Sequence, residues 1–572
     1  EIICRSKVHL MIVTGDMPAV SQMSHTSTSA GKYGCRICEV KGHHPDNMSS
    51  GMYFCDNQAS LRSKVDYLKG NAETMIYKPS IFSILPSFSG SLYFALDELH
   101  LISHGIGKHI YQLITVDLYP NKNQHFFYTK KDKTISKDRY PFRIKRADLK
   151  RIGQNITLSR KNIPVSFEGS FDNFIGNTEG VRAVDYQDFL VNIVPVLVVP
   201  LITSRSCKKA ILALVRGCAL SLQWNLTEDL LTEIDVNFGI WHNYLTQQVD
   251  QRNISRSVFR SVQHYLNHIT LVIREMGPLR TYSTRSLERS IGKYSSAIKS
   301  KVASGANAGN VVESFGVRSY IKSVLDINDI INPIIPAPYS SNTYMNNPDE
   351  SSTSQLWEPF ISSCLNSLDS IIEGVPVKSI VKSLKKYYSR VTSMPFGRIV
   401  LTDLDITLAA RCWIDNRIYS SLFDRRKKKE SRRGNHFVMF HSSFVDSRNI
   451  VKQAWFVGSV VFFFQHKNRE NSSSSECISF LALVEVMKEH TVSEYDRNIP
   501  VVKMNKSKKQ QLLENPNCTL IDPKYAVINI NDIVRQVGLV QSIISSVYHS
   551  VISPYFVFNN NLAETAGNIV NL

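Results

Sequence analysis

The sequence predicts a chain of the α/β plus α plus β class, with a short α/β segment, a long helical region and a small β-barrel-like C-terminal domain. The apolar run "VHLMIVTG", residues 8–15, ends in Gly and indicates a short buried strand. From about residue 180 to residue 275, apolar residues recur at helical spacing. After residue 434, short apolar runs alternate with polar loops, which is typical of a β-barrel or sandwich.

Composition bounds the size and the partners of the chain. Its 572 residues are 43% hydrophobic and 20% charged, which is ordinary for globular proteins. This length corresponds to roughly three to four domains. The net charge of +18 favours a polyanionic partner, because Lys and Arg side chains displace counterions from phosphates. A basic surface without such a partner is the alternative.

Cysteine usage argues against a secreted disulfide-bonded protein, and hydropathy argues against a membrane-spanning one. The ten cysteines are mostly scattered, so we expect a reducing compartment and no secreted disulfide framework. The most apolar segment, residues 189–202, is too short for a membrane span and contains Pro195 and Pro200, so we expect a buried core segment and no membrane. The chain begins without Met or a signal peptide, and we expect it to be a fragment of a longer reading frame.

A Cys-x-x-Cys pair, Cys35 and Cys38, suits zinc, because two thiolates on one loop can face a tetrahedral ion. Two further ligands are needed. His264 and His268 are spaced i,i+4 before the helix break "GPLR", so their imidazoles point the same way. The pair His100 and His104 has the same spacing. Spacing alone leaves both pairs open, and an exposed or hydrogen-bonded histidine is the alternative for each.

Two acidic residues stand out by their position. Asp16 follows the expected strand, where it either caps the next turn or serves as a metal ligand at the strand end. Glu288, in "RSLERSIGK", is the natural second acid, although one Glu among several cations is also typical of a salt-bridged helix. The pattern of residues alone favours the structural role for both acids.

Four stretches together resemble the catalytic region of CACTA-type (En/Spm) DNA transposases, most closely their fungal branch. They are "VTGDMPAV…CRIC", "LDELHLISHGIGK", "QHYLNHI" and "RSLERSIGKYSSAIKSKVASGANAGNVVES". The resemblance covers most of the chain from residue 1 to about residue 320. It implies an RNase H-like fold and Mg²⁺-dependent DNA cleavage and strand transfer by a DDE/DDD triad.

The resemblance assigns roles to individual residues. Asp16 matches the second triad carboxylate and Glu288 the third, both as ligands of catalytic Mg²⁺. His100, in "DELH", matches a histidine expected near the scissile phosphate, with a core histidine as the alternative. Asp185 aligns loosely with another family Asp, as an auxiliary candidate.

The zinc ligands also follow from resemblance. The V(D)J recombinase is similar in having a Cys pair about 20 residues after one acid and a His pair about 20 before the other. Here Cys35 lies 19 residues after Asp16, and His268 lies 20 residues before Glu288. This symmetry favours His264 and His268 as partners of Cys35 and Cys38. The expected zinc site is a closed, structural one.

The family's first catalytic Asp is expected upstream of the residues in this chain. We therefore expect a DNA transposase fragment, with a catalytically inactive, transposase-derived DNA-binding protein as the alternative. The resemblance implies double-stranded DNA as partner (transposon ends and target), a nuclear location and a possible homo-oligomer. A zinc-stabilised interaction module without nucleic acid is a third possibility, which the charge of +18 disfavours.

Together, these observations predict seven segments. They are a remnant of the RNase H-like sheet with the Cys-x-x-Cys loop (1–39), a mainly helical insertion (40–255), closing helices of the catalytic domain (256–332), a linker rich in Pro, Ser and Asn (333–356), a helical connector (357–424), a basic loop (425–434) and a β-rich C-terminal domain (435–572). The basic loop could serve in nuclear localisation or DNA contact, or simply be a solvated loop.

Overall fold

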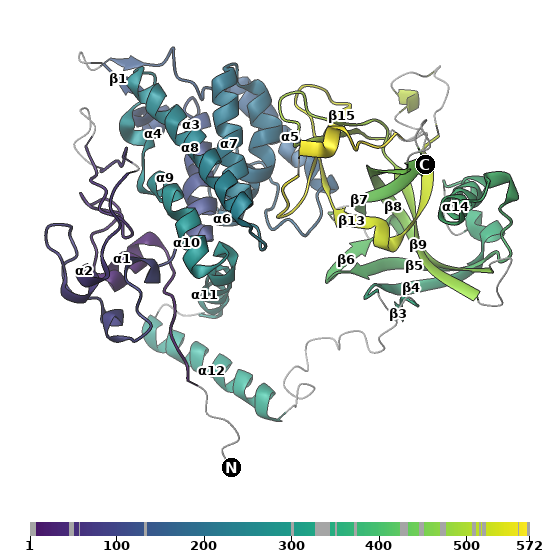
Figure 1. Ribbon diagram of the computed structural model, residues 1–572, viewed down its shortest axis with the longest axis horizontal. Coiled ribbons are helices and arrows are strands. Elements are labelled where there is room, and N and C mark those ends of the chain that lie inside the picture. Colours follow the sequence, from purple (N-terminus) through teal and green to yellow (C-terminus); the bar gives the residue numbers. More distant parts are fainter. Residues whose placement is uncertain are drawn as a thin grey trace.

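Helices dominate the first 325 residues and strands the remainder, and the two halves lie side by side (Figure 1). The described part of the chain is 43% helical and 21% strand. The structure is a computed structural model that describes residues 7–44, 51–56, 58–130, 134–298, 302–325, 344–348, 352–370, 374–423, 433–445, 451–469, 476–505, 511–513, 516, 522–558 and 560–568.

The segment before Asp16 is extended but is not the buried strand expected over residues 8–15. Val13 forms a single parallel bridge, in which its N–H donates to the Tyr93 carbonyl at 2.8 Å and its carbonyl accepts from Ala95 at 3.0 Å. Residues 7–11 are exposed, because no described strand lies beside them. In the described residues up to 325, the two-stranded pair β1 (Tyr128–Thr129) and β2 (Ile135–Ser136) is the only sheet, so the RNase H-like fold stays a prediction.

The expected helical region is confirmed. A π-helical segment, Leu99–Gly107, continues into α3, and a second one, Phe189–Val198, continues from α6. The side-chain oxygens of Ser204 and Thr227 accept backbone N–H groups at the first turns of α7 and α8. The α-helices are α1 (Met17–Ser24), α2 (Lys64–Lys69), α3 (Lys108–Ile114), α4 (Pro120–Asn123), α5 (Arg146–Ser159), α6 (Ala183–Asp188), α7 (Arg205–Ser221) and α8 (Glu228–Asp250).

The apolar segment 189–202 lies in the core, as expected. Phe189, Leu190 and Leu197 are almost fully buried and pack in the same cluster as α7 and α8. By length and composition alone, Ala183–Leu201 could cross a membrane, but 78% of its most apolar window is buried inside the protein, as in a core helix.

The helices after residue 260 include the sharp break predicted at Gly277–Pro278. Gly277 ends α10 with φ of 83°, a conformation that glycine adopts without strain. A 3₁₀ turn, Leu279–Tyr282, then leads into α11, none of whose residues is buried. The helices here are α9 (Ser261–Tyr265), α10 (Ile269–Met276), α11 (Arg285–Ala297) and α12 (Ser304–Leu325).

The C-terminal half contains two antiparallel sheets. The larger runs β12-β9-β8-β5-β4-β3, with β7 pairing with β8 and β13, and β6 pairing with β5; the smaller runs β10-β11-β15-β14. Successive phenylalanines of β8 face opposite sides, so Phe463 packs in one core and Phe462 and Phe464 in the core under α14 (Val377–Thr392). The strands are β3 (Tyr344–Asn346), β4 (Gln355–Cys364), β5 (Asp405–Ile414), β6 (Arg417–Ser420), β7 (Phe437–Val445), β8 (Val451–Arg469), β9 (Glu476–Val486), β10 (His490–Val492), β11 (Pro500–Lys503), β12 (Lys524–Asn529), β13 (Ile533–Gln536), β14 (Gly538–Gln541) and β15 (Tyr548–Ile552).

The secondary structure corrects several expectations for this half. Residues 357–424, expected to be a helical connector, contribute most of β4 and all of β5 and β6, and α14 is their one long helix in the described residues. The expected linker 333–356 includes β3, while residues 333–343 lie outside the described residues. Most of the expected basic loop, residues 425–432, also lies outside them. The described strands do not close into a barrel.

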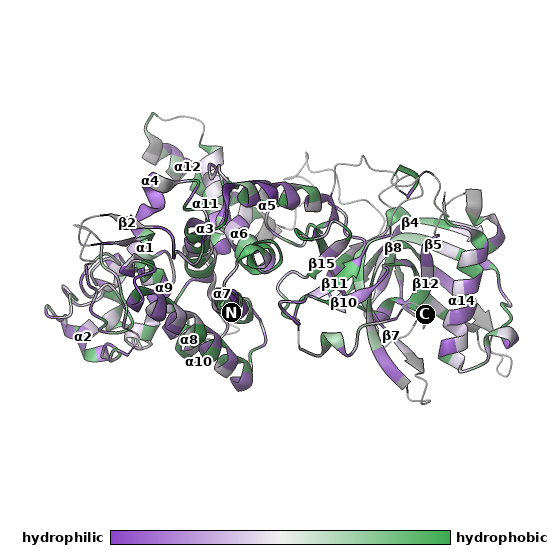
Figure 2. Ribbon diagram, turned by 90° about the horizontal axis from the view of Figure 1, so that it is seen from above, coloured by the Kyte–Doolittle hydropathy of each residue, from purple (hydrophilic) through white to green (hydrophobic). Residues whose placement is uncertain are grey.

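The two halves meet between α5 and the smaller sheet, in which β15 is labelled (Figure 2), and polar contacts join α5 to β14 and the loop after it. Arg151 of α5 donates to the carbonyl of Ile543 at 2.8 Å, and Ser159 accepts from the backbone N–H of Gln541 at 3.1 Å. Arg433 donates to four carbonyls between residues 163 and 169. Hydrogen bonds between side chains of one half and backbone groups of the other therefore join the two halves.

Candidate metal centre and adjoining cleft

Four side chains from distant parts of the chain converge at one buried point. The Sγ of Cys38 lies 3.1 Å from Nε2 of His264, and the Sγ of Cys35 lies 3.6 Å from Nε2 of His268. The two Nε2 atoms are 3.1 Å apart. All four ligand atoms lie within 4.8 Å of one another, and all four residues are buried.

These separations fit a tetrahedral metal ion. With Zn–S bonds of about 2.3 Å and Zn–N bonds of about 2.0–2.1 Å, ideal tetrahedral angles place two nitrogens about 3.3 Å apart and a sulfur and a nitrogen about 3.5 Å apart. The observed distances of 3.1 and 3.6 Å are close to these values. The cluster could therefore hold a metal such as zinc, with no ligand position left for water.

The local fold explains how the two thiols face one point. The backbone N–H groups of Ile37 and Cys38 both point to the Sγ of Cys35 at 3.4 Å, which curls the Cys-x-x-Cys loop around that sulfur. The hydroxyl of Tyr265, one residue after His264, accepts from the N–H of Arg36 at 3.1 Å. The cysteine loop is thus fastened to the histidine segment independently of a metal.

The electrostatics of the thiol pair also suit metal binding. Burial alone would raise the pKa of Cys35, yet its contacts with Cys38 and with the imidazoles of His264 and His268 hold that pKa well below its ordinary value. The contact with Cys35, and then burial, raise the pKa of Cys38. The lowered pKa of Cys35 favours its thiolate, which is the form that binds metal.

The structure separates the two histidine pairs that spacing left open. His264 and His268 join the cysteines, whereas His100 and His104 line a neighbouring cleft. The cluster ties the loop that follows Asp16 to the helical segment that precedes Glu288. Both of these acidic residues line the same cleft, which has a volume of about 1170 Å³.

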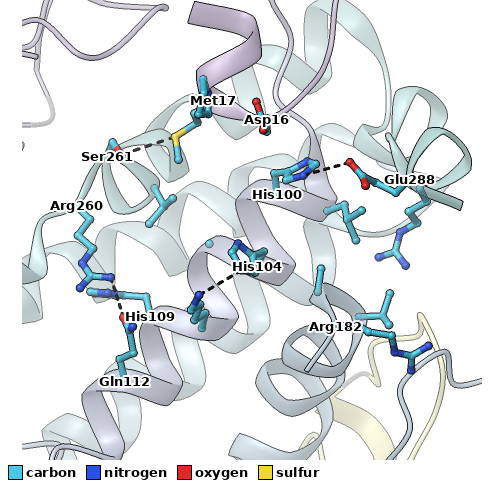
Figure 3. A pocket seen from close by; sticks show the side chains of 18 of the residues that line it. Asp16, Met17, His100, His104, His109, Gln112, Arg182, Arg260, Ser261 and Glu288 are labelled. Carbon is cyan, nitrogen blue, oxygen red and sulfur yellow. Dashed lines mark hydrogen bonds and ion pairs between the residues drawn. The ribbon is translucent and has the colours of Figure 1, made fainter. Parts of the chain in front are cut away.

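Asp16, His100 and Glu288 lie close together at one end of this cleft (Figure 3). Nε2 of His100 is 3.7 Å from a carboxylate oxygen of Glu288. The hydrogen bond to Asp97 is the main cause that raises the pKa of His100, and the charges of Glu288 and Asp16 raise it further against the effect of burial. The carboxylates of Asp16 and Glu288 at this end of the cleft therefore favour a cation, and Arg285 and Arg289 line the same cleft.

Asp97, which the sequence analysis did not single out, organises this end of the cleft. Its carboxylate accepts from the backbone N–H of His100 at 2.9 Å and contacts Nδ1 of His100 at 2.6 Å. It also accepts from the backbone N–H and the hydroxyl of Thr284, both at 2.8 Å. Thr284 immediately precedes α11, so Asp97 connects the histidine to the helix that carries Glu288. Burial opposes ionisation of Asp97, but these hydrogen bonds hold its pKa below the ordinary value.

The adjacent Glu98 fixes the same helix start from the other side. Its fully buried carboxylate accepts from Ser283 at 2.7 Å and pairs with Arg285 at 2.5 Å. Arg285 also contacts Glu168 and Gln187. Asp97 and Glu98 are two consecutive acids inside the apolar helical pattern of residues 96–106. This pattern is the signal that could have identified their contacts with the start of α11, because a buried carboxylate needs partners.

The remaining acidic candidates have identifiable structural contacts. Asp16 caps α1, since its side chain accepts from the N–H of Ala19 at 2.7 Å, so the capping role is present beside any metal-binding one. Glu288 is 46% exposed toward the cleft. Asp185 pairs with Arg182 and accepts from the N–H of Ser170 at 2.7 Å, which accounts for its buried position structurally.

No protein-family model matches the chain, and no curated protein matches it either.

Proposed function

We propose that the helical half of this chain is part of the catalytic region of a DDE/DDD-type DNA transposase, with Asp16 and Glu288 as two of its three carboxylates. One observation carries the proposal. The Cys35/Cys38/His264/His268 cluster fastens the segment after Asp16 to the segment before Glu288, and both carboxylates line one cleft with His100. A structural metal that joins two catalytic segments would explain the similar sequence separations: Cys35 lies 19 residues after Asp16, and His268 lies 20 residues before Glu288.

The carboxylates at this end of the cleft suit Mg²⁺, which prefers oxygen ligands and keeps several waters. The charges of Glu288 and Asp16, which help to raise the pKa of His100, also favour a divalent cation. Asp16 and Glu288 would hold the ions. Bound Mg²⁺ would activate the attacking oxygen and stabilise the leaving oxygen in phosphodiester cleavage and strand transfer.

The chain's own residues would bind and orient the DNA. Asp97 holds the ring of His100 through Nδ1, which leaves Nε2 facing the cleft and Glu288. A protonated His100 would donate from Nε2 to a phosphate oxygen. The net charge of +18 supports a DNA backbone as partner, and a nuclear location and a homo-oligomeric assembly are part of the same proposal.

Metal-directed cleavage of the polypeptide tests the carboxylate site without requiring a complete triad. Fe²⁺ and ascorbate are added to the zinc-loaded full chain, and cut sites are mapped by mass spectrometry. We expect cuts near residues 16, 100 and 288 that excess Mg²⁺ suppresses and that D16N and E288Q remove. E313Q, an exposed carboxylate change on α12, is the matched control and should leave the cuts unchanged. Cuts scattered along the chain, or insensitive to both variants, would contradict the carboxylate site.

A second function is a catalytically inactive, transposase-derived DNA-binding protein. The engagement of Asp16 as a helix cap, and the contact between Glu288 and His100, favour it, because both carboxylates have partners without a metal ion. This function predicts salt-dependent binding to duplex DNA that Mg²⁺ does not alter, with no localised Fe²⁺ cuts. The transposase proposal predicts the cuts.

A further inference from the structure

The end of the cleft away from Asp16 and Glu288 has the opposite character. Arg260, Gln112 and His109 lie there (Figure 3). Lys108 also lines the cleft, one helical turn beyond His104. The cleft therefore runs from a carboxylate end to a basic end.

Arg260 is half-buried without an acidic partner. Its Nη1 donates to Oε1 of Gln112 at 2.8 Å, and its Nη2 is 3.1 Å from Nε2 of His125, over the ring of Phe126. No carboxylate of the described residues lies within ion-pair distance of it. A guanidinium has five N–H donors, so these two contacts leave donors for a ligand. Because partly burying an unpaired cation is unfavourable, an anion at this end would complete the site.

The histidines around Arg260 do not supply the positive charge. Burial lowers the pKa of His104, and Lys108 lowers it further. Burial and then Arg260 lower the pKa of His109 and of His125, the latter to about 4. These imidazoles are neutral at pH 7, so the permanent charges of Lys108 and Arg260 define the basic end.

The spacing along the helix suits a nucleic-acid strand. His100, His104 and Lys108 occupy positions i, i+4 and i+8 of one continuous helix that lines the cleft. At close to 1.5 Å per residue, His100 and Lys108 are roughly 12 Å apart along its axis. One DNA strand advances about 3.4 Å per nucleotide along the duplex axis, so this separation corresponds to about three to four nucleotides.

We propose that Lys108 and Arg260 form a phosphate subsite, which binds the backbone of a DNA strand about three to four nucleotides from the phosphate at the carboxylate end. The identity of the strand rests on the proposed function, whereas the anion site rests on Lys108 and Arg260 alone. Free phosphate shares the chemistry, but a continuous cleft of about 1170 Å³ is much larger than one phosphate ion. The extended strand is therefore the favoured occupant.

Fluorescence anisotropy of a labelled DNA strand and of its duplex, titrated with the full-length chain at two salt concentrations, tests the subsite. The variants are K108A and R260Q, and K382A on α14 is the charge-matched control outside the cleft. We expect each cleft variant to weaken binding by about tenfold, as for loss of a charged hydrogen bond. Each should also reduce the slope of log K against log salt by about 0.7 to 0.9.

Each alternative result decides the proposal. Equal losses in K382A and K108A would indicate general electrostatics and overturn the subsite, as would normal binding by both cleft variants. If R260Q unfolds, as circular dichroism would reveal, K108A still decides, because the Lys108 side chain is only partly buried. If inorganic phosphate occupies the site but neither variant loses affinity for DNA, the site binds small anions. The proposal that it binds a DNA strand would then be wrong.

The two proposals can fail separately. D16N and E288Q remove negative charge from the cleft, so DNA binding without Mg²⁺ should be retained or tightened if the basic end binds the strand. Fe²⁺ cuts near residues 16 and 288, together with normal DNA binding by K108A, would leave the transposase proposal standing and remove the subsite. A tenfold loss of DNA affinity in K108A, without Fe²⁺ cuts, would support the subsite and contradict the transposase proposal.

Discussion

Replacement of Asp97 by Asn is expected to loosen the carboxylate end of the cleft. The side chain of Asp97 is fully buried and accepts four hydrogen bonds, two from His100 and two from Thr284. The amide keeps the shape but removes the charge, and it turns an acceptor into a donor that faces other donors. Charge-assisted hydrogen bonds contribute about 1.5–3 kcal/mol each and neutral ones about 0.5–1.5. Because His100 is partly exposed, we expect a net loss of about 2–3 kcal/mol in the free energy of unfolding.

Two measurements check the effect of D97N. Urea unfolding followed by tryptophan fluorescence gives the loss of stability, and NMR titration of the His100 ring gives its pKa, which should fall toward the ordinary value. D172N, which removes an exposed ion pair with Arg160, is the matched control and should cost about 0–1 kcal/mol. If D97N behaved like D172N and left the pKa of His100 raised, Asp97 would not be the residue that positions His100.

Two further predictions concern pH and packing. The lowered pKa of Asp97 stabilises the fold at pH values above the ordinary carboxyl range, and this contribution is lost as the pH falls through the pKa of the folded state. The raised pKa of His100 stabilises the fold below about pH 6.5, and this contribution is lost as the pH rises through the pKa of the folded state. Urea midpoints should therefore be highest between these two limits, and D97N should flatten the profile; a profile unchanged by D97N would contradict this. G217A in α7 would place a Cβ 2.6 Å from the Phe238 ring and should cost about 1–3 kcal/mol, whereas G239A in α8 meets nothing within 4 Å and should stabilise by about 0.5–1 kcal/mol, as thermal unfolding would show. Equal effects of the two glycine changes would refute the packing argument.

The sequence predicted the helical half better than the β-rich half. The region from about residue 180 to residue 275, where apolar residues recur at helical spacing, does contain the partly buried helices α7, α8 and α10, because burial of one helix face fixes that periodicity. In β5, the central residues 408–410 are buried on both faces of the sheet, so the alternation that marks a strand is weak there. For this reason the sequence predicts a helical connector over residues 357–424, where β5 lies.

The candidate site was predictable where the ligands have sequence signatures. Cys35 and Cys38 carry such a signature, but the choice of His264 and His268 over the other histidine pair depended on a family resemblance, because i,i+4 spacing is the same in both. Asp97 was missed, since its role depends on Thr284, which lies 187 residues away. Contacts of this range follow from tertiary packing and leave no local pattern.

The central claim is that one metal ion joins the Cys35–Cys38 loop to the His264–His268 segment and so keeps two carboxylates on one cleft. X-ray absorption at the zinc edge of the purified full chain tests it most directly. The claim predicts one zinc per chain with two sulfur ligands at about 2.3 Å and two nitrogen ligands at about 2.0–2.1 Å, a signal that H264A/H268A abolishes. A chain that binds no zinc, or that keeps the same four-ligand spectrum after both histidines are replaced, would contradict it.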